Sequence, residues 1–208
     1  MRSRPGRLFY LMSKRLLDFS VSASGLMLLA PVMLVIGLII KVSSPGPVFF
    51  RQKRTGHRGR IFDVVKFRTM GTDAEKVVVQ LAEYRERKEP FVKLKKDPRV
   101  YPFGNILRKT SLDELPQLIN VMVGQMSLVG PRPLLPVEME AASEKQRERR
   151  LATKPGLTGW AQINGRTDVT FEGLMSMDLE YLERQSLRFD SEILLKTVVV
   201  VMKRRGAY

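Results

Sequence analysis

Apolar residues are concentrated in one stretch near the N-terminus. Residues 26–41 read LMLLAPVMLVIGLIIK, and no charged residue occurs from Phe19 to Ile40. About 20 apolar residues are enough for a helix to span the hydrocarbon core of a bilayer. No face of this stretch is polar, which argues against the surface helix of a soluble protein. The pattern therefore predicts a membrane helix over residues 19–42.

The charges around this segment bear on its path through the membrane. Residues 1–70 contain 13 Lys and Arg but only two acids, and the basic residues lie on both sides of the segment. Basic flanks favour the cytoplasmic side. Pro31 removes a backbone N–H near the middle, and a helix over residues 19–30 is only about 18 Å long. We therefore expect a re-entrant helix that is broken at Pro31 and leaves the membrane on the side where it entered.

Three other interpretations of the apolar segment are less favourable. A proline-kinked transmembrane helix is the strongest of them, but it would place one basic flank outside the cytoplasm. A secretory signal peptide is disfavoured because the stretch is long and KVSSPGPV has no small-x-small cleavage site. A soluble core helix is the least favoured of the three.

The pattern after the apolar segment predicts one compact domain. Residues 48–52 and 61–67 are rich in strand-forming residues and flank a glycine-containing loop, which predicts a β-hairpin. Helices are expected over residues 73–89, 112–123, 138–153, 171–186 and 189–204, with irregular loops over 127–136 and 154–166. The last helix is compatible with burial or with a place on the membrane surface. Trp160 is expected to be a core anchor or an interfacial aromatic, and the core position is favoured.

These elements define the expected fold class and domains. The fold is α+β and mostly helical, with a small hairpin and interfacial helices. Residues 1–18 form a basic N-terminal segment, residues 19–42 the re-entrant helix, and residues 43–208 a cytosolic catalytic domain.

Composition narrows the classes of partner. The chain of 208 residues has a net charge of +15, so its partners are expected to be nucleic acid, phospholipid head groups or phosphorylated substrates. It has no cysteine and one histidine, which excludes disulfides, thiolate metal sites and cysteine nucleophiles.

Candidate chemistry is concentrated at LRKTSLDELPQLINVMVGQMSLVGPRPLL. Asp113 and Glu114 are adjacent acids at an expected helix start. Ser111 and Glu114 have the spacing of a capping box, which is the structural interpretation of this pattern. Adjacent carboxylates near several cations can also bind Mg²⁺ and attack a phosphate.

An ordered set of motifs resembles the bacterial sugar transferase family, the monotopic phosphoglycosyl transferases, over nearly the whole chain. The motifs are KRLLDF, the apolar segment with its proline, FRQKRTG, KFRTM, LRKTSLDELPQL, MSLVGPRPLL and KPGLTGWAQINGR. The resemblance implies transfer of a sugar phosphate from a UDP-sugar to polyprenyl (undecaprenyl) phosphate with release of UMP. This reaction is the first membrane step of exopolysaccharide, O-antigen or glycoprotein glycan assembly. The resemblance also implies a bacterial inner membrane protein with its catalytic domain on the cytoplasmic face.

The resemblance also assigns site residues. It implies that Asp113 is the nucleophile, forming an aspartyl-phosphosugar, and that Glu114 binds Mg²⁺, with Mn²⁺ as a possible substitute. The phosphate-binding cations would be Lys66, Arg108, Arg132 and Arg166. Many family members have serine directly before the helix-bending proline, whereas this chain has Ala30 before Pro31.

Two functions from other classes remain as alternatives. A basic nucleic-acid-binding protein would explain the charge but not the apolar segment, and no helix-turn-helix or RNP pattern is recognisable. A noncatalytic membrane-anchored scaffold would explain the apolar segment and its basic flanks. The favoured partners are a UDP-sugar, polyprenyl phosphate and anionic membrane lipids, with no nucleic acid.

Overall fold

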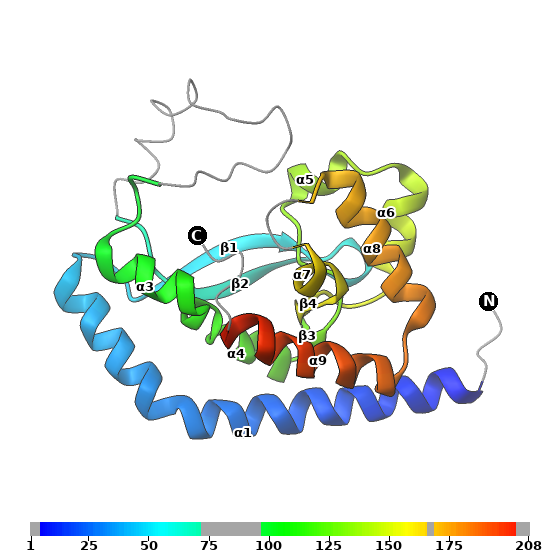
Figure 1. Cartoon of the computed structure of the whole chain (residues 1–208), viewed down its shortest axis with the longest axis horizontal. Helices are drawn as coiled ribbons and strands as arrows, with labels where there is room; N and C mark the ends of the chain where they lie inside the picture. The colour runs from blue at the N-terminus through cyan, green and yellow to red at the C-terminus, as the bar shows by residue number, and fades with distance from the viewer. Residues whose placement is uncertain (1–4, 72–96, 166–168, 203–208) are drawn as a thin grey trace.

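The chain folds into a mostly helical body resting on one long N-terminal helix (Figure 1). The structure, a computed structural model, describes residues 5–71, 97–165 and 169–202. The helix expected over residues 73–89 lies outside these ranges. In chain order the elements are α1 (Pro5–Ser43), β1 (Phe49–Thr55), η1 (His57–Gly59), β2 (Ile61–Phe67), α3 (Pro102–Thr110), η3 (Leu112–Glu114), α4 (Gln117–Met122), β3 (Ser127–Val129), α5 (Pro136–Glu140), α6 (Glu144–Leu151), β4 (Gly156–Thr158), α7 (Trp160–Asn164), α8 (Phe171–Arg184) and α9 (Leu187–Met202).

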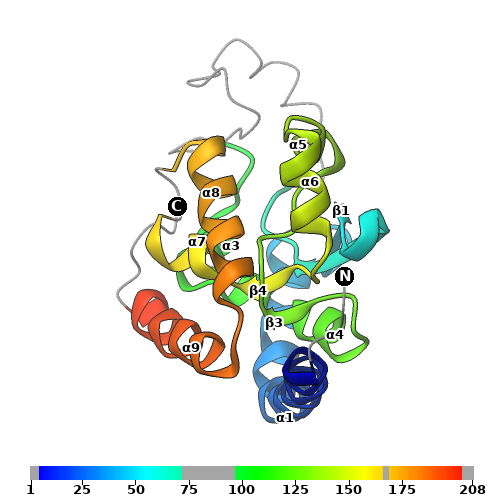
Figure 2. The ribbon, with the colours of Figure 1, turned by 90° about the vertical axis from the view of Figure 1, so that its right-hand side faces the viewer.

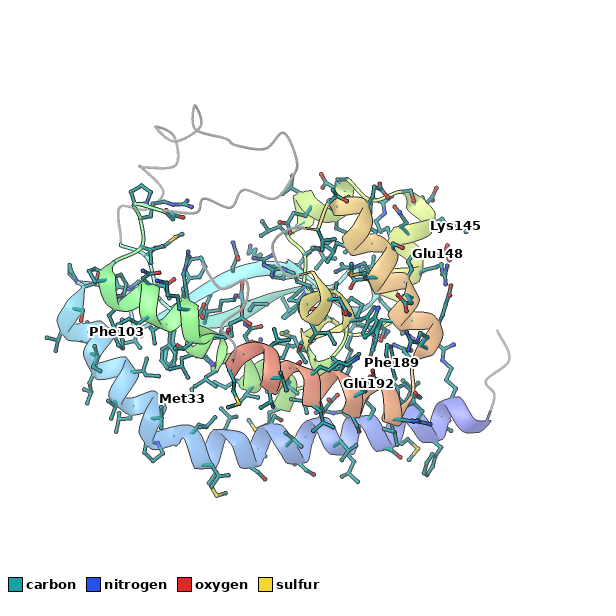
Figure 3. The ribbon with its side chains drawn as sticks, in the orientation of Figure 1. Met33, Phe103, Lys145, Glu148, Phe189 and Glu192 are labelled. Carbon is teal, nitrogen blue, oxygen red and sulfur yellow. The ribbon has the colours of Figure 1, made fainter. Side chains whose placement is uncertain are left out.

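Helix α1 is longer than the expected membrane segment. It begins at Pro5, so most of the basic segment assigned to residues 1–18 is helical, and it continues across Pro31 to Ser43. The helix changes direction along its course (Figure 1), and Met33 lies on the second arm (Figure 3). A proline inside a helix removes one backbone hydrogen bond and bends the axis without ending it. The segment is therefore a single bent helix.

The expected β-hairpin is confirmed. Strands β1 and β2 pair antiparallel, with Phe50 opposite Lys66 and Arg54 opposite Phe62. Its turn contains Arg58, which has a left-handed backbone with φ of 56°. Alternation along each strand puts Phe50, Gln52 and Arg54 on one face of β1, the face shared with Lys66.

A second strand pair was not predicted. Strands β3 and β4 are parallel and come from the two segments expected to be irregular loops. The backbones approach so closely that a Cβ at Gly156 would lie 2.1 Å from the nitrogen of Gly130. Glycine is therefore required for this pairing.

The C-terminal helices pack around this pair. Helices α8 and α9 confirm two predicted helices, whereas the expected helix over residues 138–153 is divided into α5 and α6. The division occurs at Ser143, which caps α6 by accepting a hydrogen bond from the backbone of Gln146. Trp160 packs against Phe189 in the core, with ring centroids 5.1 Å apart, as expected for an anchor.

The first arm of α1, the part before Pro31, is hydrogen-bonded to the rest of the body. Lys14 and the Tyr10 hydroxyl donate to Asp190 of α9 at 2.7 and 2.9 Å. The Asp18 carboxylate, which is buried, accepts from the backbone N–H of Leu128 at 2.9 Å. The contacts of Lys14 and Asp18 come from the KRLLDF motif, which together with Tyr10 fixes the first arm to α9 and β3.

The second arm of α1 is fixed to the same body by apolar packing. Ile36 and Ile40 are buried in a cluster with Phe67 of β2 and Leu107 of α3. Arg68, which follows β2, donates to the carbonyl of Ser44, the first residue after α1, at 2.7 Å. Both arms of α1 thus contact one folded unit.

The outward side of α1 is apolar and exposed. Helix α1 has the length and composition to cross a membrane, and few of its apolar side chains are buried. Helices α4 and α9 lie beside it, as two views show (Figures 1 and 2). Exposed apolar side chains of these three helices, together with Val123 directly after α4, include Leu8, Phe9, Met12, Leu16, Met27, Leu28, Leu34, Val35, Leu38, Ile119, Leu195, Val198 and Met202. Such a surface is typical of a membrane protein.

Candidate active site

The adjacent acids lie on a tight turn between two helices. Helix α3 ends at Ser111, which has a left-handed backbone with φ of 57° and donates its N–H to carbonyls of the last turn of α3. The one-turn helix η3 follows and contains Asp113 and Glu114. The side chain of Ser111 makes no capping hydrogen bond. The capping-box interpretation of Ser111 and Glu114 is therefore wrong.

Lys66 lies directly beside the acidic pair. Its ammonium donates to Oε1 of Glu114 at 2.7 Å, and both side chains are partly exposed. Lys66 extends from β2, about fifty residues earlier in the chain, so the ion pair joins the hairpin to η3. The sequence-based expectation that Lys66 belongs with the acids is consistent with this contact.

Asp113 is the buried member of the pair. The residue is only 9% exposed. Burial, together with the neighbouring Glu114 charge, raises the pKa of Asp113 from 3.8 to about 6. Lys66 and Arg108 oppose this shift by favouring the charged form. A carboxylate that is desolvated and repelled by its neighbour is poised to react with or bind a positive centre.

Arg108 approaches the acids from α3. Its Nε donates to Oγ1 of Thr69 at 2.9 Å, and the charges of Asp113 and Asp97 act on its guanidinium. Helix α3 is very close to the segment after β2, since a Cβ at Gly104 would lie 2.2 Å from the Thr69 carbonyl oxygen. This close approach needs glycine and brings Arg108 towards Asp113.

Asn120 holds the acidic turn against the hairpin. From α4, its side-chain amide donates to the carbonyl of Asp63 at 2.8 Å and accepts from the N–H of Val65 at 3.1 Å. These two bonds pair backbone groups on the edge of β2 that faces away from β1, a role that a third strand would otherwise fill. Because η3 leads into α4, the same bonds fix the position of Glu114 relative to Lys66.

Arg132 lies in the proline-flanked loop after β3. Its backbone carbonyl accepts a hydrogen bond from Arg150, whose Nε donates to the buried carboxylate of Asp178 at 2.8 Å. The Arg132 side chain itself is partly buried. The loop that bears Arg132 is thus anchored from α6 and α8.

Arg54 is a site residue that the sequence analysis missed. Its guanidinium donates to the carbonyl of Pro133 at 3.1 Å and pairs with Glu138 at 3.5 Å. Burial and the charge of Arg132 lower its pKa to about 10, while Glu138 and Glu114 oppose this shift. Arg54 therefore lies within electrostatic range of both Arg132 and Glu114, and it ties the Arg132 loop to β1.

A signal for Arg54 was present in the sequence. The residue belongs to FRQKRTG, and strand alternation puts it on the same face as Phe50, the partner of Lys66. The structure thus brings together Asp113, Glu114, Lys66 and Arg108, with Arg132 linked to them through Arg54. Arg166 lies outside the described residues. Ala30 and Pro31 are exposed on α1 and belong to the membrane-facing surface.

The acids fit a magnesium ion that is completed by substrate. Among the described residues, no group of three or more His, Asp or Glu side chains could hold a metal alone. Mg²⁺ commonly binds one or two carboxylates together with phosphate oxygens and water. Besides burial, the neighbouring Glu114 charge raises the pKa of Asp113, so the two carboxylates repel one another. A divalent cation would relieve that repulsion.

Comparisons with known proteins identify relatives of this chain. Residues 9–204 match the bacterial sugar transferase family. The exopolysaccharide production protein ExoY of Sinorhizobium fredii is 40% identical over 94% of this chain and 88% of that protein. The UDP-glucose:undecaprenyl-phosphate glucose-1-phosphate transferase of Escherichia coli is 42% identical over 94% of this chain but only 41% of that protein. The undecaprenyl-phosphate galactose phosphotransferase of Salmonella typhimurium is 40% identical with the same coverages.

The chain therefore belongs to the bacterial sugar transferase family. It is an enzyme, a phosphoglycosyl transferase, and the alternative of a noncatalytic scaffold is set aside. Its match to ExoY covers most of both chains, whereas the two larger relatives extend well beyond the region that they share with it.

The burial of Asp113 predicts a pH-dependent gain of stability on substitution. The unfolded carboxyl ionises near 3.8 and the folded one near 6, so folding becomes less favourable as the pH rises through this window. Asp113→Asn should therefore stabilise the metal-free protein near neutral pH, on the order of 2 kcal/mol, and lose this advantage below the window. Unfolding of detergent-solubilised protein, followed across pH, measures this.

Glu140→Gln is the control, because Glu140 is an exposed acid at the end of α5. It should leave the free energy of unfolding unchanged at every pH. If Asp113→Asn destabilises the protein near neutral pH, the carboxylate is not under the electrostatic stress inferred here.

Proposed function

We propose that this enzyme moves a sugar phosphate from a UDP-sugar to undecaprenyl phosphate, releasing UMP, through an aspartyl-phosphosugar intermediate. The product, an undecaprenyl diphosphate sugar, would start the assembly of an exopolysaccharide or another surface glycan. The names of two relatives support the substrate classes. Both names include undecaprenyl phosphate, and one also includes UDP-glucose. The single observation that carries the mechanism is the buried carboxylate of Asp113 beside the Glu114–Lys66 ion pair.

In the first step, a carboxylate oxygen of Asp113 attacks the phosphorus that bears the sugar. The bond from that phosphorus to the bridging oxygen breaks, and UMP leaves with the electron pair. Lys66 and Arg108 would offset the charge of the diphosphate, which otherwise repels a carboxylate nucleophile. Arg132, on its anchored loop, would bind the same anion. Arg166 keeps the phosphate-binding role expected from the sequence.

In the second step, a phosphate oxygen of undecaprenyl phosphate attacks the same phosphorus. The acyl phosphate bond to Asp113 breaks, the carboxylate is regenerated, and the diphosphate link to the lipid is formed. Both displacements use one carboxylate, so the kinetics should be ping-pong. The exposed apolar surface of α1 supports an acceptor that is held in the membrane.

Mg²⁺ would be held by Glu114, with the Asp113 carboxylate left for attack. When bound, such an ion neutralises phosphate oxygens and favours departure of UMP. The chain has no cysteine and a single histidine, so a zinc site of the usual type is not available. Mn²⁺ has a similar preference for oxygen ligands and is expected to substitute.

The membrane seating is also part of the proposal. The protein would lie in the bacterial inner membrane, with both ends of α1 and the catalytic body on the cytoplasmic side. The hydrogen bonds of Lys14 and Asp18 support this path, because the first arm must lie on the same side as the body it contacts. Pro31 lies between the two attached arms.

Asp113→Asn tests the covalent step. The wild-type protein, incubated with UDP-sugar and Mg²⁺ but no lipid, should gain the mass of one sugar phosphate, as measured by intact-protein mass spectrometry. The asparagine variant should still bind UDP-sugar but form no adduct and lose turnover by several orders of magnitude. Glu140→Gln is the matched control. Normal turnover by Asp113→Asn, or kinetics that require both substrates to be bound together, would exclude Asp113 as nucleophile.

Glu114→Gln tests the metal site. Mg²⁺ should raise the unfolding temperature of the wild-type protein in the presence of UMP, because a ligand that binds only the folded state stabilises it. The variant should lose most of this stabilisation and most activity. Turnover that persists undiminished in excess chelator would refute a metal requirement.

Single cysteines test the topology, which is straightforward because the native chain has none. Gly6→Cys and His57→Cys should both resist a membrane-impermeant thiol reagent in intact cells and react after permeabilisation. Labelling of Gly6→Cys alone in intact cells would demonstrate a through-going helix. Pro31→Leu, introduced together with Gly6→Cys, should straighten α1 and increase labelling, since it restores the missing backbone donor.

A further inference from the structure

Two cations outside the catalytic site lie together at the end of α4. Arg15 of α1 donates to the carbonyls of Val121 and Met122, both at 2.8 Å, and thereby caps this helix. A Cβ at Gly124, which has φ of +85°, would lie 3.3 Å from the guanidinium carbon of Arg15 and 3.4 Å from the ammonium nitrogen of Lys154. Both charges are thus within 3.4 Å of one point above Gly124.

The two hydrogen bonds of Arg15 explain its position in the fold. Nothing comparable explains the position of Lys154. Lys154 is partly buried, and no described residue accepts a hydrogen bond from its ammonium or forms an ion pair with it. Burial and the Arg15 charge lower the pKa of Lys154. The acid that opposes this shift is Asp18, whose Oδ1 is already bonded to Ser127 and Leu128. The pair therefore carries excess positive charge.

More positive charge comes from the hairpin turn. Arg58, Lys154 and Arg60 all lower the pKa of His57, so these groups share one electrostatic environment. The turn is close to the end of α6, where a Cβ at Gly59 would be 3.9 Å from the Leu151 side chain. A site between this turn and α4 would favour an anion.

The apolar surface of the protein begins directly beside the cation pair. Val123, next to Gly124, is 58% exposed, and Leu16, next to Arg15, is 67% exposed. Met12, one turn earlier on α1, is 65% exposed. Cations placed immediately above apolar side chains match the order of chemical groups in a lipid, in which the phosphate lies above the acyl chains.

We propose that Lys154 and Arg15 form a binding site for the phosphate group of an anionic membrane lipid, separate from the catalytic acids. The site rests on the membrane seating proposed above and adds a specific lipid contact to it. Lys154 supplies the free N–H donors, while Arg15, held on α4, supplies a fixed charge. The bound lipid would hold the body at a defined depth through the KPGLTGW segment.

Amine acylation of the full-length protein in nanodiscs tests this site. Labelling rates are compared for nanodiscs of phosphatidylcholine alone, of phosphatidylcholine with phosphatidylglycerol, and of phosphatidylcholine with added inorganic phosphate. Phosphatidylglycerol should slow acylation of Lys154 by more than the factor of about five that surface potential alone gives one basic residue at an anionic surface. Inorganic phosphate should have no such effect, and equal protection by it would replace the lipid site with a soluble-anion site.

Two other lysines serve as controls within the same sample. Lys41, at the end of α1, is exposed and donates to the carbonyl of Gly46, so it reports the general effect of an anionic surface. Lys145 lies on α6, far from α1 (Figure 3). Protection of Lys154 should exceed that of both. Equal protection of Lys41 and Lys154 would mean that only surface potential is acting, and the proposal would fail.

Native mass spectrometry of matched variants supplies a second readout. Lys154→Gln should retain one phosphatidylglycerol fewer than wild type, whereas Lys154→Arg and Lys145→Gln should retain the wild-type number. The result does not depend on turnover, so it stays separate from the test of Asp113. Unchanged lipid retention by Lys154→Gln, in a variant that unfolds at the wild-type temperature, would overturn the site.

Discussion

The attachment of both arms of α1 to one folded body constrains the rest of the structure. The first arm is held by buried polar contacts, such as Asp18 with the backbone of Leu128, and the second by burial of Ile36 and Ile40. Apolar side chains between and around these contacts remain outside the body. A buried carboxylate with hydrogen-bond partners is costly to separate from them, so the first arm cannot leave the body freely. The helix is therefore both a membrane element and part of the scaffold of the site.

The candidate site places like charges close together. Asp113 is desolvated beside Glu114, and Arg54 is buried near Arg132, so like charges are adjacent on both sides. Such an arrangement persists only if the backbone around it is held firmly. The side chain of Asn120 on the edge of β2 and the close approach at Gly104 provide that support. A diphosphate and a divalent cation would each relieve one of these repulsions.

Local sequence patterns predicted the elements whose signals are local. Aromatic and β-branched runs around a glycine loop predicted the hairpin, and the two helices expected near the end of the chain correspond to α8 and α9. The capping box failed because Ser111 adopts a left-handed conformation that ends α3, and its side chain makes no capping hydrogen bond to η3. The β3–β4 pair could not be predicted because three-residue strands are specified by a distant partner and not by their own composition.

The candidate site illustrates the same division between local and distant information. Asp113 and Glu114 were recognisable from a motif, but their unequal burial depends on how η3 packs against the hairpin. Arg54 was hidden in a run of basic residues, and only the register of β1 with β2 separates it from exposed neighbours such as Lys53. Lys154 and Arg15 are far apart in the chain and meet because both approach the end of α4. Charge composition thus predicts that anions bind, while tertiary packing decides which cations act together and on which anion.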